Sequence, residues 1–71
     1  MNVAINRDAA LRAIFAFEMD NKKEFRYWEN LGIEYLQSGD GSRWYFKVIN
    51  KELLMWSMLK YGFEIESYSN L

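Results

Sequence analysis

The fold is decided by residues 33–62, which read IEYLQSGDGSRWYFKVINKELLMWSMLKYG. The runs IEYLQ and SRWYFKVI flank the loop SGDGS, and the second run is dense in aromatic and β-branched residues. The Gly-Asp-Gly centre of the loop supplies the backbone conformations of a hairpin turn. Asn50 then precedes a helical run that ends before Gly62. Asparagine is a favoured helix N-cap and glycine a favoured left-handed C-cap. We therefore predict strands over 33–37 and 42–49 and a helix over 51–61.

Two further asparagines stand before helix-like runs on the N-terminal side of this segment. Asn6 precedes RDAALRAIFAFEM, and Asn21 precedes KKEFRYWEN. Glu24 lies three residues after Asn21, as in a capping box, and Gly32 follows the second run. These signals predict helices over 7–19 and 22–31, with one bent helix through residue 31 as the alternative.

On the C-terminal side, the run FEIESYS alternates between apolar and polar residues, which predicts a strand over 63–68. Phe63 and Ile65 would share one face, and Glu64, Glu66 and Tyr68 the other. A helix between two strands predicts that strands 42–49 and 63–68 are parallel neighbours joined by a right-handed crossover. We expect strand 42–49 in the middle of the sheet, where Arg43 and Lys47 would meet Glu64 and Glu66. The start, MNVAI, fits either a frayed tail or an edge strand.

These elements predict a single α+β domain over residues 1–71. The chain has 71 residues, the size of one small domain, which buries about 60% of the surface that the unfolded chain exposes. The expected order is α-α-β-β-α-β, with a three-stranded mixed sheet packed by helices.

The composition argues against enzymatic chemistry. The chain has no histidine and no cysteine, so the commonest general base, the commonest metal ligand and all thiolate chemistry are absent. Asp40, Glu64 and Glu66 could serve as paired carboxylates, but a chain this short offers little concave site around them. We expect no cofactor, no metal site and no catalytic residue.

The longest apolar stretch runs from Ala9 to Met19 and is interrupted by Arg12 and Glu18. A membrane span needs about 20 apolar residues, and a signal peptide needs an uninterrupted apolar run. The sequence therefore predicts a cytoplasmic protein without membrane attachment.

The chain carries more large apolar side chains than one small core needs. Once its 5 alanines are set aside, 31 large apolar or aromatic residues remain. The helix over 51–61 is apolar on far more than one stripe, and its methionines and aromatic residues are typical of binding surfaces. We predict an interface with a protein partner whose identity the sequence does not name, in a chain expected to form a homodimer. The predicted interface residues are Met55, Trp56, Met58, Leu59 and Tyr61, with Phe15 from the first helix at the flank.

An alternative from another functional class is a small nucleic-acid-binding module. Basic and aromatic residues alternate along strand 42–49, as in proteins that stack bases on a sheet. Trp44 and Phe46 point to the opposite face, however, so only Tyr45 would accompany the cations. The candidate contacts are Arg43, Tyr45 and Lys47 on the strand and Lys22, Lys23 and Arg26 on the second helix.

No named family matches the chain residue by residue. In its small size, slightly acidic balance and lack of catalytic residue types, it resembles compact accessory proteins of phages and mobile elements. The leading interpretation is a non-enzymatic interaction protein, such as an inhibitor, an adaptor or an assembly subunit.

Overall fold

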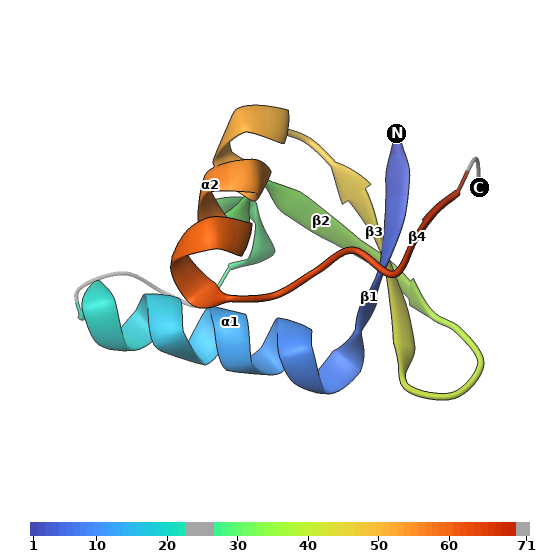
Figure 1. Cartoon of the computed structure of the whole chain (residues 1–71), viewed down its shortest axis with the longest axis horizontal. Coiled ribbons are helices and arrows are strands. Elements are labelled where there is room, and N and C mark those ends of the chain that lie inside the picture. The colour runs from blue at the N-terminus through green and yellow to red at the C-terminus, as the bar shows by residue number, and fades with distance from the viewer. Residues whose placement is uncertain (23–26, 70–71) are drawn as a thin grey trace.

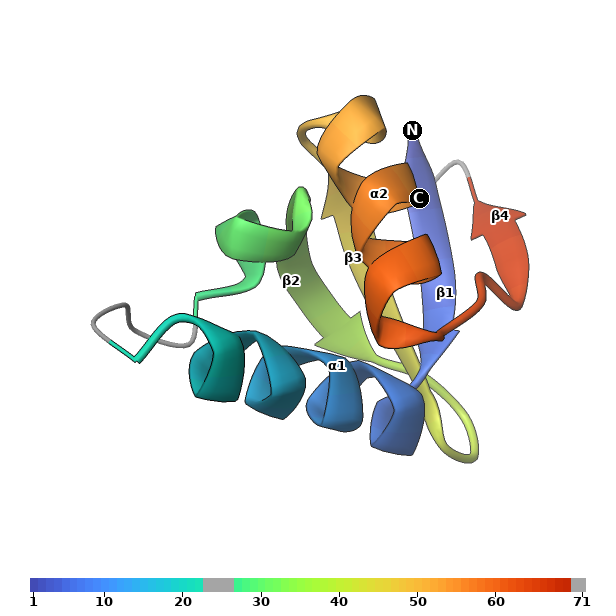
Figure 2. The same cartoon turned by 60° about the vertical axis from the view of Figure 1, so that its left-hand side comes forward.

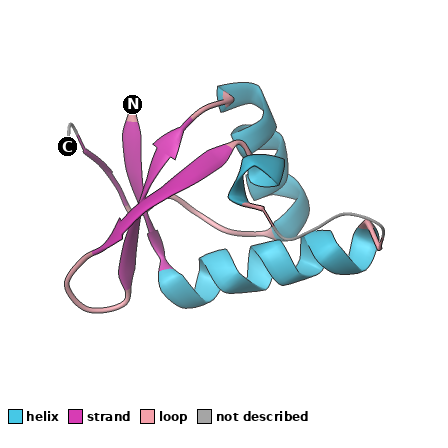
Figure 3. Ribbon diagram, turned by 180° about the vertical axis from the view of Figure 1, so that it is seen from behind, coloured by secondary structure: helices cyan, strands magenta, loops and turns pink. Residues whose placement is uncertain are grey.

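The computed structural model describes residues 1–22 and 27–69 and confirms the α+β class (Figure 1). Both α-helices lie on one side of a four-stranded antiparallel sheet, and the other face of the sheet is open (Figure 3). The elements are β1 (Asn2–Asn6), α1 (Arg7–Asp20), the 3-10 helix η1 (Trp28–Leu31), β2 (Ile33–Ser38), β3 (Arg43–Val48), α2 (Lys51–Tyr61) and β4 (Ser67–Ser69).

The N-terminal segment is neither a tail nor an edge strand. It forms β1, which pairs with β3 on one side and with β4 on the other. Val3, Ala4 and Ile5 are completely buried. Val3 and Ile5 belong to the hydrophobic core under the helices, whereas Ala4 points to the open face. An interior strand has neighbours on both sides, and the residues opposite Ala4, Tyr45 and Ser67, flank its small side chain.

The strand order is β2-β3-β1-β4, so the predicted three-stranded mixed sheet is wrong. The interior position of strand 42–49 is confirmed, since β3 lies between β2 and β1. β3 and β4 run in the same direction, and α2 joins them by a right-handed crossover (Figure 2). They are not neighbours, because β1 lies between them. This order of elements and strands is the split βαβ arrangement of ferredoxin-like folds.

The first helix is confirmed, and the second is wrong where the structure describes it. Asn6 caps α1, accepting a hydrogen bond from the Ala9 amide at 3.0 Å. Asn21 ends α1, since its backbone and side-chain amides both donate to the Phe17 carbonyl. Glu24 lies outside the described residues, as do Lys23 and Arg26.

Tyr27 is extended, so neither an α-helix over 22–31 nor one bent helix through residue 31 exists. The four residues of η1 replace it, and they end at Gly32 in the left-handed conformation. Tertiary packing explains the short turn: the Trp28 ring packs edge-on against Phe46, with centroids 5.0 Å apart, and Leu31 is fully buried.

The last strand is shorter than predicted. Regular pairing begins at Ser67, after a segment in which Phe63 is buried and the Glu66 amide donates to the Ala4 carbonyl at 2.8 Å. The predicted faces of this segment therefore change. Ile65 and Tyr68 lie on the same side of the sheet, because residues 63–66 do not follow the alternation of a regular strand.

Packing onto the sheet fixes the start of α2. The amides of Ile49 and Asn50 both donate to the Gly32 carbonyl, at 3.0 and 3.1 Å. The Asn50 side chain caps the helix by accepting from the Leu53 amide at 3.0 Å. Leu54 and Ser57 face the sheet and are buried, and the helix ends at Gly62 in the left-handed conformation. The boundaries predicted for this helix are confirmed.

Candidate functional site

The outer side of α2 exposes three large apolar residues. Met55 and Trp56 are each 55% exposed and Leu59 is 86% exposed. Met55 and Leu59 are four residues apart and so lie on one side of the helix, and Trp56 follows next around it. Leu54 and Ser57 already occupy the side that faces the sheet, and more than half of the surface of Met55, Trp56 and Leu59 is left exposed by the described elements.

An apolar groove of about 200 Å³ lies between α2 and β4. Figure 2 shows that α2 covers the middle of the sheet and that β4 stands beside it at the edge. The lining contains one charged residue; its members are Met1, Lys51, Leu54, Met55, Met58, Leu59, Ile65 and Tyr68. We call these residues, together with Trp56, the α2–β4 surface.

The structure brings together only part of the predicted interface. Met55, Met58 and Leu59 line the groove, and Trp56 lies beside it. Tyr61 instead turns inward, where its ring packs edge-on against Phe17, with centroids 6.4 Å apart. Phe15 lies two residues before Phe17, about 200° around α1, and therefore projects from the side away from α2.

Lys60 makes a cation–π contact with Trp56 and an ion pair with Asp20 of α1. Its ammonium lies 4.7 Å from the centroid of the Trp56 ring and 3.7 Å from a carboxylate oxygen of Asp20 at the end of α1. A cation over an indole ring stabilises it by roughly 0.5–1 kcal/mol at an exposed site. The contact orients an aromatic ring that remains more than half exposed.

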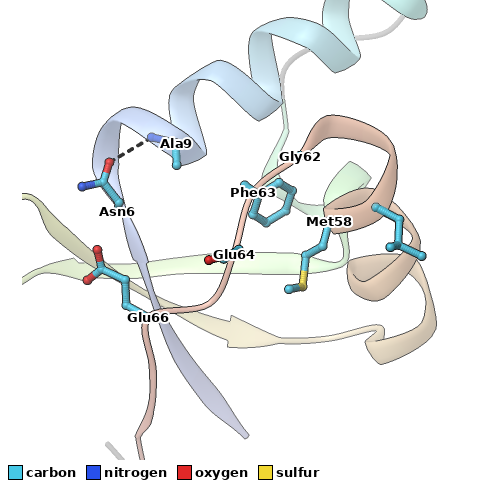
Figure 4. A pocket seen from close by; sticks show the side chains of 8 residues that line it. Asn6, Ala9, Met58, Gly62, Phe63, Glu64 and Glu66 are labelled. Carbon is cyan, nitrogen blue, oxygen red and sulfur yellow. Dashed lines mark hydrogen bonds between the residues drawn. The ribbon is translucent and has the colours of Figure 1, made fainter.

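A second, more open hollow of about 610 Å³ lies at the other side of the C-terminal end of α2 (Figure 4). Its residues come from the start of α1, the end of α2 and the segment that leads to β4: Asn6, Ala9, Met58, Leu59, Gly62, Phe63, Glu64 and Glu66. Met58 and Leu59 line both hollows. The end of α2 is therefore accessible from two sides.

The basic strand residues of the alternative interpretation lie on or beside the open face of the sheet, but their charges are balanced. Arg43 donates to a carboxylate oxygen of Glu66 at 3.2 Å. Hydrogen bonds to Tyr45 and then to Glu66 raise the pKa of Arg43 above its usual value. Lys47 stands opposite Glu34 of β2 in the sheet register. The predicted contact of Arg43 with Glu66 is thus present, although their strands are not neighbours.

The other candidates for nucleic-acid contact are less informative. The Tyr45 ring lies against Gly39 in the hairpin loop, where a Cβ would collide with it. Lys22 is exposed just after α1. Lys23 and Arg26 are outside the described residues. The residues that are described do not form a concentrated positive patch.

Sequence reasoning missed Met1, Ile65 and Tyr68 as members of the groove. They come from the two ends of the chain and reach α2 only because β1 and β4 are neighbours. Tyr68 is 68% exposed, and a large aromatic residue in the final strand was the available signal. The alternation of residues 63–68 predicts Tyr68 and Ile65 on opposite faces of the strand, so it does not group them in one site.

Comparison with family models, curated protein sequences and solved structures finds no significant match for the chain. Within residues 1–22 and 27–69, no three acidic side chains gather closely enough to hold a metal ion. In the same ranges no helix combines the length and the apolar character that crossing a bilayer requires.

Proposed function

We propose that this protein is a non-enzymatic interaction module that binds a protein partner through the α2–β4 surface. The observation that supports this most is the apolar groove of about 200 Å³ flanked by the exposed side chains of Met55, Leu59 and Tyr68. A concave apolar site with protruding apolar neighbours is suited to bind a matching protein surface.

The cost of leaving this surface in water supports the proposal. Burying a large apolar side chain is worth roughly 1.5–3 kcal/mol. Contiguous apolar patches above a few hundred Å² are uncommon on monomers and mark interaction sites. Leu59, at 86% exposure, has nearly all of this energy available for binding a partner.

The composition of the surface indicates the kind of binding. Met1, Met55 and Met58 line the groove, and methionine side chains adapt their shape to irregular apolar partners. Trp56 and Tyr68 supply the aromatic anchors that commonly dominate interface energies. An inhibitor, an adaptor or an assembly subunit, including an accessory protein of a phage or mobile element, would use such a surface.

Nucleic-acid binding has weaker support. A single-strand binder needs uncompensated cations beside several stacking rings. Here Arg43 is paired with Glu66, Lys47 stands opposite Glu34, and Tyr45 is the one aromatic residue on that face of β3. Steep weakening of binding with salt would favour this alternative, since each phosphate contact adds nearly one power of salt dependence.

Affinity capture from an extract of the source organism, read by mass spectrometry, tests the proposal when it is run with matched variants. Leu59→Glu places a charge in the groove, and Leu36→Glu places the same charge on β2, where Leu36 is 41% exposed. We expect partners that are retained by the wild type and by Leu36→Glu and lost with Leu59→Glu. Equal capture by both variants, with unchanged circular dichroism, would contradict the proposal.

A further inference from the structure

The outer edge of β4 presents one backbone donor and one backbone acceptor at Tyr68. On either side of β1, the Met1 carbonyl accepts from the Val48 amide at 2.9 Å and the Arg7 amide donates to the Ser42 carbonyl at 2.6 Å, so the odd-numbered residues of β1 bond to β3. The even-numbered residues of β1 therefore face β4. Since Val3 is opposite Tyr68, the amide and carbonyl of Tyr68 point away from β1. No described strand lies on that side.

We infer that the occupant of this edge is a second copy of the chain, paired with it antiparallel about a two-fold axis at Tyr68. This inference rests on the proposed function, because the two copies would meet through the α2–β4 surface. The result is one continuous eight-stranded sheet with the two β4 strands at its centre.

The geometry of the edge favours a second copy over an unrelated strand. An antiparallel pair of identical strands is self-complementary under a two-fold axis. With Tyr68 opposite Tyr68, its amide donates to the partner's carbonyl and its carbonyl accepts from the partner's amide, which satisfies both exposed groups. A register shifted by one residue would place Tyr68 opposite Ser67, whose amide and carbonyl already face β1.

The sequence of β4 has neither the charge nor the proline that commonly blocks edge pairing. Exposed edges are commonly protected by charged residues, by proline, by a bulge or by a very short strand. β4 is short, with three residues, and its pairing is therefore limited to the one donor and one acceptor of Tyr68. The strand reads Ser-Tyr-Ser, which has neither a charge nor a proline. The net charge of -1 also provides almost no repulsion between two copies.

The side chains extend the contact beyond the backbone. Tyr68 lies on the helix side of the sheet, so the pairing would place the two Tyr68 rings side by side, with Met55 and Leu59 of each copy above them. Met1, Met55, Leu59 and Tyr68 are 55–86% exposed. At roughly 200 Å² for a fully exposed large side chain, they offer on the order of 500 Å² per copy.

That area sets the strength of the dimer. Stable interfaces bury about 800 Å² per partner, so this contact belongs at the weaker end. We therefore expect a reversible dimer in the micromolar range. Sedimentation velocity over about 1 to 300 µM should show the mass rise from one chain to two. One chain at every concentration would overturn the inference.

Hydrogen exchange locates the contact. The Tyr68 amide faces solvent in the single chain and should exchange rapidly when the protein is dilute. Exchange should slow at concentrations where the dimer forms, while the interior amide of Phe46 stays protected throughout. A dimer in which the Tyr68 amide remains unprotected would overturn the proposed pairing.

Chemical synthesis of the 71-residue chain allows a sharper test. N-methylation of the Tyr68 amide removes the edge donor and leaves the ring and the pairing with β1 in place. The dimer should weaken at least tenfold, whereas Leu36→Glu should leave it unchanged. If the N-methylated chain dimerises as well as the wild type, the inference fails. If the wild type is monomeric but capture of other proteins still depends on Leu59, the proposed function survives and the second copy is excluded.

Discussion

Replacement of Gly32 by alanine should destabilise the protein more than any other single glycine-to-alanine change at a left-handed position. Gly32 has φ of 81°, and alanine in the left-handed region costs about 1–2 kcal/mol. A Cβ there would also collide with the Asn50 carbonyl oxygen and lie 2.8 Å from the Leu54 nitrogen. These two atoms form the first backbone hydrogen bond of α2, at 3.0 Å. The methyl group would therefore push apart the first turn of that helix.

The magnitude follows from the two effects together. Forcing a methyl group into packed backbone costs about 1–3 kcal/mol. Added to the conformational cost, this gives a loss of about 2–5 kcal/mol in the free energy of unfolding. A chain of 71 residues has about 4–10 kcal/mol in total. The variant should therefore lose about half of the free energy of unfolding of the wild type.

Gly62→Ala is the matched control, because Gly62 has φ of 70° and an added Cβ would meet no described atom within 4 Å. It should lose only about 1–2 kcal/mol. Urea unfolding at one protein concentration, followed by circular dichroism and tryptophan fluorescence, measures both variants. If the two variants lose the same free energy within about 0.5 kcal/mol, the contact between Gly32 and the start of α2 is not the cause.

The remaining predictions concern single polar groups. Ser57→Ala should raise the unfolding free energy by about 1 kcal/mol, since the buried Ser57 hydroxyl has no hydrogen-bond partner among the described residues; a loss of stability in urea unfolding would contradict this. Asn50→Ala and Asn6→Ala should each cost about 1 kcal/mol by removing a helix cap, whereas the corresponding aspartate variants, which keep the acceptor, should retain most of the stability in the same assay. Because the pKa of Arg43 is raised in the folded protein, its contribution to stability is complete at any pH below the usual pKa of arginine and is lost only in strongly alkaline solution. The difference in melting temperature between wild type and Arg43→Gln should therefore stay constant from about pH 6 to pH 9. A difference that changes over this range would refute that assignment.

The candidate site could be predicted only in part. The all-round apolar character of residues 51–61 correctly indicated that Met55, Trp56 and Leu59 would be exposed, because one helix cannot bury every side of itself against one sheet. The same reasoning could not separate Tyr61, which packs against Phe17, from its exposed neighbours. It also placed Phe15 beside α2, although the side of α1 that meets α2 is set by packing.

Local sequence determined the elements whose signals lie within a few residues of each other. Asn50 marks the start of α2 and Gly62 its end, because a cap bonds to backbone groups of its own helix. SGDGS joins β2 to β3 because the conformation of the turn depends on its own residues. Tertiary structure decided the rest. β1 is a strand only because β3 and β4 pair with it, and η1 is a short turn because Trp28 packs on Phe46. The groove lies between α2 and β4, and Met1, from the opposite end of the chain, also lines it. Met1 reaches this position because β1 is the neighbour of β4 in the sheet. Such contacts depend on the arrangement of whole elements, and no short stretch of sequence specifies them.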